Sequence, residues 1–296
     1  MSLAMLLDNP AAVIAACPTE PKLYHRDPES FRALLTREEV DNLIDTDCLA
    51  MQNIALLKDG TPVETYLYAD GSMPKEGYLR QFLTDGGTLS IRSLERLKPT
   101  IAALYRGVAK ETGHRVHVNA YYTPIDRQGL RYHYDPYVTL IVQLSGQKAW
   151  PLHRPFVQNP VREYGSYHTR GFTPEEWRFL EHTPPAETYT LKPGDVFWLP
   201  PGFVHAPYTV GDEPSLHLTV ALKQRTWQWM ASQVAGRVLS QALADPAMRA
   251  SLAPIEVIGD PQAAVKEARA YLVAALLNLD LDKAAESVRR AALQSR

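Results

Sequence analysis

The chain has 296 residues and a formal net charge of −2, from 31 Lys and Arg against 33 Asp and Glu. Hydrophobic residues make up 45% of it, so it can bury a large core, which excludes a disordered or fibrous protein. The balanced charge gives no overall attraction to nucleic acid or to an anionic membrane. We therefore expect neither as a direct partner.

The cysteines and the N-terminus bear on the compartment. The sequence holds only 2 cysteines, Cys17 and Cys48, and neither has a partner at metal-binding spacing. We interpret them as ordinary thiols in a reducing compartment. Residues 1–16 lack a basic n-region and a run of about 18 apolar residues. The default expectation is a cytoplasmic protein.

Residues 1–115 mix helical and strand-like patterns, and we interpret them as an α/β flank of a larger domain. Thr36-Arg37-Glu38-Glu39 has the spacing of a capping box and predicts the start of a helix. Further expected elements are strands over Met51–Leu57 and Val63–Tyr68 and helices over Tyr78–Thr84 and Ser93–Thr112.

The pattern changes from Val116 onward to short β-rich runs separated by Gly and Pro. Repeated short strands of this kind are typical of a barrel or sandwich, which we assign to residues 116–225. A capped helix is expected inside the long connection, at Thr173–Trp177. The expected strands are Val116–Tyr122, Arg131–Leu144, Lys148–Leu152, Thr188–Leu191, Val196–Leu199 and Ser215–Lys223.

Residues 226–296 are helical in pattern. Three amphipathic helices are expected, over Trp227–Leu243, Asp260–Leu279 and Leu281–Leu293. Three such helices can form a dimerisation module or pack back on the barrel. The predicted fold is thus mainly β with helical flanks and a C-terminal helical bundle.

The most informative stretch is the seven residues 131–137, which contain His133 and Asp135. We expect this run to belong to a strand, whose side chains alternate between faces. His133 and Asp135 would then point the same way and could bind one metal ion from the same side. Tyr134 would point the other way.

A third candidate ligand is His205. It follows a Pro-Gly-Asp turn, a buried strand and a second Pro-Gly pair, an order that brings a late strand of a cupin-like barrel beside an early one. His133, Asp135 and His205 would form a 2-His-1-carboxylate set that leaves open positions on an octahedral Fe(II). The pattern therefore predicts an iron centre for oxidative chemistry.

Each of these residues also has a simpler interpretation. His133 could be a core histidine whose ring is satisfied by Asp135, since a His-x-Asp pair often occurs by chance. The remaining histidines are expected to be surface or packing residues in loops or helices. They are His25, His114, His117, His153, His168 and His182.

Lys148 begins the strand that follows a Gly-containing turn and precedes Trp150. A dicarboxylate cosubstrate that chelates iron through one end needs a cation for its far carboxylate, and a buried lysine would supply it. The alternative is a solvated lysine in the turn.

In each of two further pairs, the residues are two positions apart in a strand, so their side chains lie on the same face. Asn119 and Tyr121 could point into the cavity and hydrogen-bond the cosubstrate, or they could face the core. His217 and Thr219 have the same relation in the last strand, with pocket and packing equally open. Candidates for a substrate wall or lid, with packing as the alternative, are Tyr132, Tyr134, Tyr137 and Trp177.

Several segments together resemble the JmjC family of Fe(II)- and 2-oxoglutarate-dependent oxygenases, specifically the ribosomal-oxygenase branch, which hydroxylates protein side chains. The resemblance covers roughly residues 20–225. Its segments are Val118–Pro124, the turn at Gly129, the His133/Asp135 pair, Leu140–Trp150 and Gly194–His205.

The resemblance implies a double-stranded β-helix of the cupin-like JmjC type and a 2-oxoglutarate-dependent dioxygenase. His133, Asp135 and His205 would bind Fe(II), and Lys148 would bind the 5-carboxylate of 2-oxoglutarate, with Asn119 and Tyr121 nearby. The reaction would consume O2 and hydroxylate a side chain of a protein or peptide, with a ribosomal protein favoured. Nucleic acid would then be met only through that substrate, and the helical tail stands in place of the family's dimerisation helices.

Two alternative functions stay open on the sequence alone. One is hydroxylation of a small molecule or of a biosynthetic precursor peptide. The other is a non-catalytic cupin-like binding or scaffold protein whose triad is structural.

Overall fold

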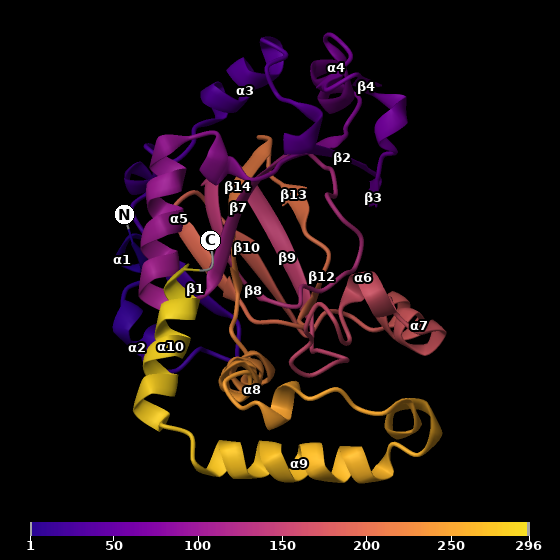
Figure 1. Ribbon diagram of the computed structural model, residues 1–296. Helices are drawn as coiled ribbons and strands as arrows, with labels where there is room; N and C mark the ends of the chain where they lie inside the picture. Colours follow the sequence, from indigo (N-terminus) through magenta and orange to yellow (C-terminus); the bar gives the residue numbers. More distant parts are fainter. Residues whose placement is uncertain (1, 295–296) are drawn as a thin grey trace. The chain divides into compact units, whose positions relative to one another are not determined.

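The computed structural model describes residues 2–294, which divide into a first unit ending at Gln224 and a second unit beginning at Arg225 (Figure 1). The first unit is built on two antiparallel sheets. In sheet order the larger one contains β1 (Lys22–His25), β11 (Asp195–Leu199), β8 (Val138–Ser145), β14 (Ser215–Lys223), β7 (Arg115–Thr123), β6 (Thr88–Ile91), β2 (Ile54–Lys58) and β3 (Thr61–Pro62).

The smaller sheet contains β10 (Glu187–Leu191), β9 (Gln147–His153) and β12 (Val204–His205), and β13 (Tyr208–Val210) also pairs with β9. From β8 onward the chain passes back and forth between the two sheets: β9 and β10 lie in the smaller, β11 in the larger, β12 and β13 in the smaller, and β14 in the larger. This is the double-stranded β-helix that the sequence predicts. A separate hairpin joins β4 (Ala69–Asp70) and β5 (Met73–Pro74).

Side chains of the larger sheet alternate between two environments. One face contributes Val118, Leu218 and Leu140 to a core that also contains Leu104 and Val108 of α5 (Pro99–Thr112). The other face looks toward the smaller sheet, where a second cluster fills part of the space between them. Its buried members are Ile141, Trp150, Leu152, Leu191, Phe197, Leu199 and Phe203.

Helices flank the barrel and form an insertion in it. Two of them begin with capping boxes, at Thr36 and at Thr173, as the sequence predicts. The first unit contains α1 (Leu3–Leu6), α2 (Pro10–Ala15), α3 (Arg37–Asp45), α4 (Tyr78–Thr84), α5 (Pro99–Thr112), α6 (Tyr167–Arg170) and α7 (Pro174–His182). Short 3-10 turns lie at Pro28–Phe31, Met51–Asn53, Thr65–Leu67, Leu94–Arg96 and, in the second unit, Ala247–Arg249, where a π-helical turn also covers Ile255–Gly259.

Several expected elements were wrong in type or extent. The strand expected from Met51 begins only at Ile54, after a 3-10 turn. Val63–Tyr68 is not a strand, because Thr65–Leu67 forms a 3-10 turn there. The helix expected over Ser93–Thr112 begins only at Pro99, since proline fits the first turn of a helix but not its interior.

A further correction concerns the motif segment. The strand expected from Arg131 begins at Val138, and before it only His133 makes an isolated bridge, to His205. Pro136 has no backbone N–H to give to a ladder, which keeps the segment before β8 outside regular pairing. The sequence interpretation also missed β1, which pairs with β11.

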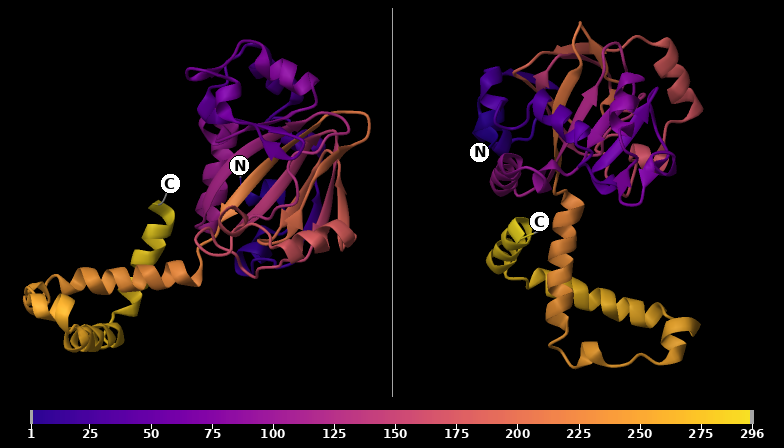
Figure 2. Two further views of the ribbon diagram at one scale, coloured as in Figure 1. Left: turned by 90° about the vertical axis from the view of Figure 1, so that its right-hand side faces the viewer. Right: turned by 90° about the horizontal axis from the view of Figure 1, so that it is seen from above.

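The second unit consists of α8 (Trp227–Ala242), α9 (Gln262–Leu277) and α10 (Leu281–Gln294), with α8 in contact with both other helices (Figure 2). The expectation of three C-terminal helices is confirmed. The assignment of residues 1–115, 116–225 and 226–296 to flank, barrel and dimerisation module remains a prediction. Within residues 2–294, no helix is both long enough and apolar enough to cross a membrane. Cys17 and Cys48 are free and exposed.

Candidate metal centre and cosubstrate pocket

The two histidines of the predicted triad are held together by their backbones. The N–H of His133 donates to the carbonyl of His205 at 3.1 Å, and the N–H of His205 donates back to the carbonyl of His133 at 2.8 Å. The N–H of Gly202 donates to the carbonyl of Asp135 at 2.9 Å. These bonds hold the extended segment 131–135 against β12 and the turn before it, so that residues far apart in sequence share one site.

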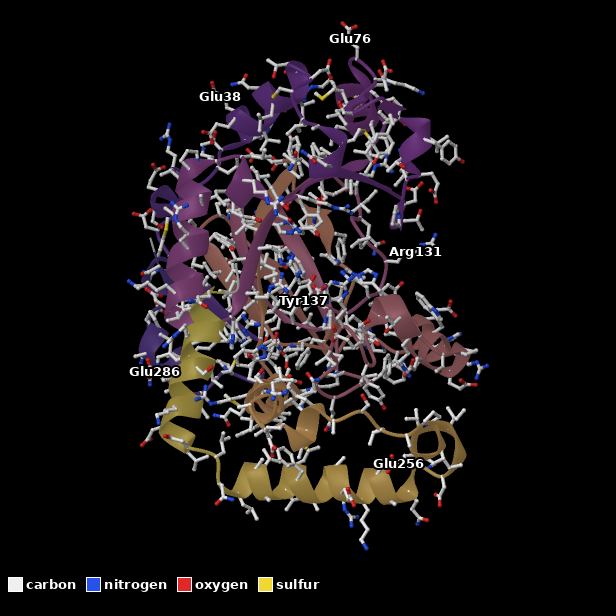
Figure 3. The ribbon with its side chains drawn as sticks, viewed as in Figure 1. Glu38, Glu76, Arg131, Tyr137, Glu256 and Glu286 are labelled. Atoms are coloured by element: carbon white, nitrogen blue, oxygen red, sulfur yellow. The ribbon has the colours of Figure 1, made fainter. Side chains whose placement is uncertain are left out.

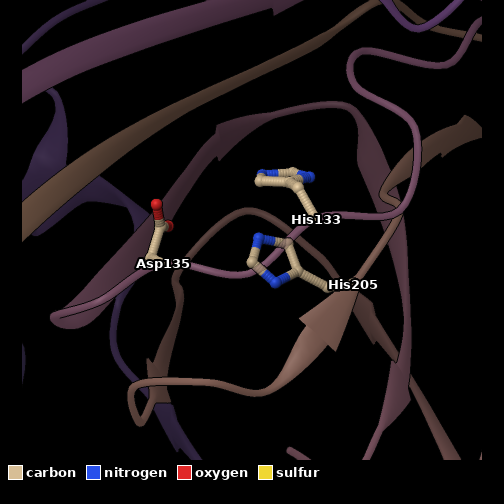
Figure 4. Close-up of side chains that lie close together, drawn as sticks. All are labelled: His133, Asp135 and His205. Atoms are coloured by element: carbon tan, nitrogen blue, oxygen red, sulfur yellow. The ribbon is translucent and has the colours of Figure 1, made fainter. Parts of the chain in front are cut away.

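Ligand atoms of His133, Asp135 and His205 all lie within 4.8 Å of one another (Figure 4). Nδ1 of His133 is 2.8 Å from the carbonyl of Arg131, and Nδ1 of His205 is 2.9 Å from the carbonyl of Phe203. A ring nitrogen next to a carbonyl must carry the proton, which leaves Nε2 of each ring with a free lone pair. Both imidazoles are therefore oriented and in the tautomer that a metal ligand requires.

The pKa shifts of the three side chains also suit a metal site. Burial lowers the pKa of His133 and lowers the pKa of His205 well below its ordinary value, so both rings are neutral near pH 7. Burial raises the pKa of the Asp135 carboxyl. A divalent cation would offset the cost of burying that carboxylate, and two neutral imidazoles with one carboxylate are the facial set that Fe(II) oxygenases use. The simpler interpretation was a core histidine whose ring is satisfied by Asp135. The ring of His133 is instead hydrogen-bonded to the Arg131 carbonyl.

Lys148 is a buried cation. Its side chain is 1% exposed, and Nζ donates to Oγ1 of Thr123 at 2.8 Å. It forms no ion pair with any residue of 2–294. Burial lowers its pKa to about 7. The structure therefore does not fit a solvated turn lysine. The ammonium is buried inside the barrel without an anionic partner, as expected of a group that binds an anionic ligand.

The two predicted pairs of β7 and β14 face one another. Tyr121 lies opposite His217 in the ladder, and Asn119 lies opposite Thr219. The rings of Tyr121 and His217 stack at 5.1 Å with 10° between their planes. Burial, and after it the nearby Asp135 carboxylate, raises the pKa of Tyr121. Tyr121 thus lies near the triad.

Asn119 and His217 differ in how their polar atoms are used. Oδ1 of Asn119 accepts a hydrogen bond from the backbone N–H of Ser93 at 3.0 Å, so this oxygen ties β7 to the segment before α5. Nδ1 of His217 is buried without a partner within the described chain. Burial, and then the nearby Lys148, lowers the pKa of His217 well below its ordinary value. The buried, unsatisfied ring nitrogen and the unpaired ammonium are two polar groups that a bound ligand could satisfy.

Sequence reasoning missed three residues of this region. Thr123 continues the alternation of Asn119 and Tyr121 and could have been found from it. Trp150, two residues after Lys148, lies 5.5 Å from the rings of both His205 and His217. His168 on α6 is exposed but close enough to influence the pKa values of His133 and Asp135.

The helical insertion packs on the back of the motif segment. Tyr134 is 2% exposed, belongs to a cluster with Leu180 of α7 and Val204 of β12, and donates a hydrogen bond to the carbonyl of Gly165 at 2.8 Å. Trp177 packs against the same cluster. Tyr132 makes an edge contact with His153 at 5.3 Å. Tyr134 and Trp177 therefore serve packing.

The other histidines have mostly structural places, although three of them lie in strands rather than in loops or helices. His25 is in β1, with Nδ1 2.6 Å from Oδ1 of Asp195. His117 is in β7, and burial lowers its pKa to about 4. His153 ends β9 and is buried.

The fold and the cluster define a class: a cupin-like double-stranded β-helix with two histidines and one aspartate gathered beside a buried lysine. Comparison with known proteins narrows this class. Residues 96–230 match the family described as the JmjC domain. This stretch, just under half of the chain, is thus similar to the JmjC domain.

Its relatives include ribosomal oxygenase 2 of Bos taurus, with 32% identity over 168 residues, 56% of this chain and 34% of that protein. The bifunctional lysine-specific demethylase and histidyl-hydroxylase NO66 of Dictyostelium discoideum is 36% identical over 129 residues, 43% of this chain and 23% of that protein. The chain thus spans about a third or less of the length of these two relatives.

Among solved structures, that of YcfD from Escherichia coli matches with a TM-score of 0.53 and 18% identity, over 93% of this chain and 69% of that one. A second structure, of YcfD as a ribosomal oxygenase in complex with cobalt and succinic acid, matches with a TM-score of 0.50 and 17% identity, over 93% and 68%. At these identities the likeness concerns the fold.

Proposed function

We propose that this protein is an Fe(II)- and 2-oxoglutarate-dependent oxygenase that hydroxylates an amino-acid side chain of a protein or peptide. The observation that carries the proposal is the pairing of two groups between the sheets. One is the His133, Asp135 and His205 cluster with both Nε2 atoms free. The other is the buried and unpaired ammonium of Lys148.

His133, Asp135 and His205 would hold the iron. When bound, Fe(II) with 2-oxoglutarate and O2 supplies the oxidising power for C–H hydroxylation, which the protein's own side chains lack. The solved YcfD complex with cobalt and succinic acid supports this choice of metal site and cosubstrate, because succinate is what 2-oxoglutarate becomes on oxidative decarboxylation.

Lys148 would bind the far carboxylate of 2-oxoglutarate. Its ammonium already has one hydrogen bond, to Thr123, and an anion would satisfy the remaining donors and favour the charged form. His217 and Tyr121, stacked on one another, would lie along the cosubstrate. We assign Asn119 and Thr219 to support of this wall, since Asn119 is bonded to the Ser93 backbone.

The rest of the barrel would position these groups and exclude water. The buried cluster that includes Trp150 and Phe197 closes the space between the sheets beside His205 and His217. A dry, rigid surrounding strengthens the pairing of Lys148 with a carboxylate and protects a reactive site from side reactions.

The substrate class follows from the relatives. One is named a ribosomal oxygenase and the other a histidyl-hydroxylase, which favours a side chain of a ribosomal protein, with histidine as the first candidate. We also propose a cytoplasmic location, where such a substrate is made.

The C-terminal helices support a homodimer. Among the described hydrophobic residues of the second unit, only Val238, Ala242 and Ala284 are buried, whereas Leu277 is 81% and Ile258 is 87% exposed. We take this density of exposed apolar side chains as support for an interface. Light scattering after size exclusion tests this, with Leu277→Asp expected to yield monomers and Glu286→Lys, on an exposed polar position, expected to leave the dimer intact.

The central test uses protein loaded with Fe(II) and 2-oxoglutarate without oxygen. We expect a weak visible charge-transfer band, followed by succinate release and a mass increase of about 16 Da on a histidine-containing ribosomal peptide once air is admitted. Asp135→Ala should lose the band and the succinate while circular dichroism stays unchanged. Absence of both signals at full metal loading would exclude the oxygenase and favour a scaffold protein.

A further inference from the structure

A group of three basic side chains lies beside the candidate metal centre, at the end of the barrel away from Lys148. Arg115 begins β7, Lys223 ends β14, and Arg162 belongs to the insertion between β9 and β10. All three are exposed, and none forms an ion pair with any other described residue. We call Arg115, Arg162 and Lys223 the basic rim.

The arrangement of the rim is unfavourable for the folded protein on its own. Arg115 and Lys223 are direct partners across the β7–β14 ladder, a position in which like charges destabilise a sheet. Partial burial, and after it the neighbouring Arg115 and Arg162, lowers the pKa of Lys223. Glu95 acts in the opposite direction, but its Oε2 already accepts a hydrogen bond from the N–H of Val118 at 3.0 Å. The charges near Lys223 thus leave a net positive surface.

One aromatic ring connects the rim to the metal site. Nζ of Lys223 lies 5.9 Å from the centroid of the Tyr137 ring. Burial, and then the Asp135 carboxylate, raises the pKa of the Tyr137 hydroxyl, so this tyrosine lies between the rim and a candidate metal ligand. Tyr137 is half-buried, whereas Arg131 is exposed and is labelled toward the edge of the molecule in Figure 3. A substrate whose target side chain reaches the metal would therefore pass close to the rim.

We propose that the basic rim binds a carboxylate side chain of the substrate, so that this enzyme acts on a target residue flanked by Asp or Glu. The inference rests on the proposed function and adds a substrate class to it. Arginine and lysine side by side bind a carboxylate through charge-assisted hydrogen bonds, and an anion would remove the repulsion between Arg115 and Lys223.

A peptide carboxylate fits better than a nucleic-acid backbone. Three cations can neutralise only about three phosphates, which gives weak and strongly salt-dependent binding. The chain as a whole carries a net charge of −2, so its overall charge adds no attraction for a polyanion. The rim also repels a strongly basic ribosomal peptide unless that peptide places an acidic residue near its target.

The test is a binding measurement without turnover, on full-length protein with Fe(II) and 2-oxoglutarate under nitrogen. Fluorescence anisotropy compares three labelled peptides with a central histidine, flanked by Asp and Glu, by Ser and Gln, or by Lys and Arg. Single-stranded oligouridine is the fourth probe. We expect the acidic peptide to bind about tenfold more tightly than the neutral one, with the preference falling at high salt.

Three variants locate the effect. Arg162→Glu and Lys223→Gln should each reduce affinity for the acidic peptide by about three- to tenfold. Arg115→Glu should lose the preference and raise the melting temperature, because it converts a like-charge cross-strand pair into an opposite-charge pair. The control Arg106→Glu, on an exposed position of α5, should leave the acidic preference unchanged.

The proposal is overturned if the acidic and neutral peptides bind equally, or if oligouridine binds more tightly than the acidic peptide. It is also overturned if Arg106→Glu lowers affinity as much as the rim variants do. These outcomes do not depend on succinate release, so a failure here leaves the oxygenase proposal standing, and a protein that binds acidic peptides without turnover would contradict only the oxygenase.

Discussion

His133 and His205 bond to one another through their backbones before any metal is considered, with N–H to carbonyl distances of 3.1 and 2.8 Å. This reciprocal bridge is the only regular pairing that the motif segment 131–137 makes with β12 in the described chain. It fixes the relative position of two candidate ligands without using their rings. The predictions on the metal site follow from this separation of backbone and side-chain roles.

Asp135→Asn should impair metal binding without unfolding the protein. The carbonyl of Asp135, not its carboxylate, accepts the hydrogen bond from Gly202, so the backbone attachment survives the substitution. Loss of the anionic ligand should weaken Co(II) affinity at least about 100-fold, since even outer partners of metal ligands contribute 10–100-fold. Calorimetric titration with Co(II) measures this. Unchanged affinity would mean that the cluster is not a metal site.

Gly202→Ala should damage the same site through the backbone. Gly202 has a φ of +85°, and an added Cβ would lie 2.9 Å from the carbonyl oxygen of Val157. The left-handed conformation alone costs an L-residue about 1–2 kcal/mol, which corresponds to a fall in melting temperature of a few degrees. We expect a larger fall, together with weaker Co(II) binding.

The matched control is Gly77→Ala. Its φ of +66° carries the same backbone cost, but no atom lies within 4 Å of the added Cβ. Both variants should lose stability, whereas Gly202→Ala alone should lose Co(II) affinity. Equal loss of affinity in the two would show that general destabilisation, not the attachment of Asp135, is the cause.

How well each part of this fold could be predicted depended on how far apart in the sequence the interacting residues lie. Alternation within one strand placed Asn119 and Tyr121 on one face, and the last strand was predicted at Ser215–Lys223 with the bounds that it has. His133 and Asp135 share a direction even though their segment is not a strand, because an extended backbone alternates whether or not it is paired. Contacts such as Lys148 with Thr123 join different strands, and no local pattern encodes them.

Short pieces were missed for a related reason. The strand β1 has four residues and depends on pairing with β11, which lies about 170 residues later in the chain. The 3-10 turn at Thr65–Leu67 has apolar and aromatic residues that are typical of a strand, but these side chains are largely exposed. In both cases tertiary packing, not local propensity, decides the structure.

Lys148→Met should stabilise the protein while abolishing 2-oxoglutarate binding. A buried ammonium without an anionic partner is unfavourable, and a methionine of similar length removes that cost. We expect a gain on the order of 1–3 kcal/mol at pH 6, measured by urea unfolding without cosubstrate. Since the pKa falls from 10.5 to about 7 on folding, the unfolded chain binds more protons between these values and wild-type stability rises with pH there. The gain should therefore shrink between pH 7 and pH 10.5. A variant that binds 2-oxoglutarate normally would remove Lys148 from the cosubstrate site.

The pH dependence of 2-oxoglutarate binding should report the same group. Burial lowers the pKa of Lys148 to about 7, so the free pocket carries its positive charge below that pH and loses it above. A dicarboxylate binds the charged form, and its dissociation constant should be flat below about pH 7 and rise up to tenfold per pH unit above it. Equilibrium binding in the presence of Co(II), followed by the change in its visible spectrum, gives this profile.

Thr123→Val provides the decisive comparison for that profile. Oγ1 of Thr123 accepts the hydrogen bond from Nζ of Lys148 at 2.8 Å, and removal of an acceptor from the ammonium disfavours its charged form. The inflection in 2-oxoglutarate affinity should therefore move to lower pH in Thr123→Val, with tight binding retained in acid. Thr84→Val, at an exposed site on α4, should leave the inflection where it is. If wild type and Thr123→Val share one inflection, the titrating group is not Lys148 and the far carboxylate of the cosubstrate binds elsewhere.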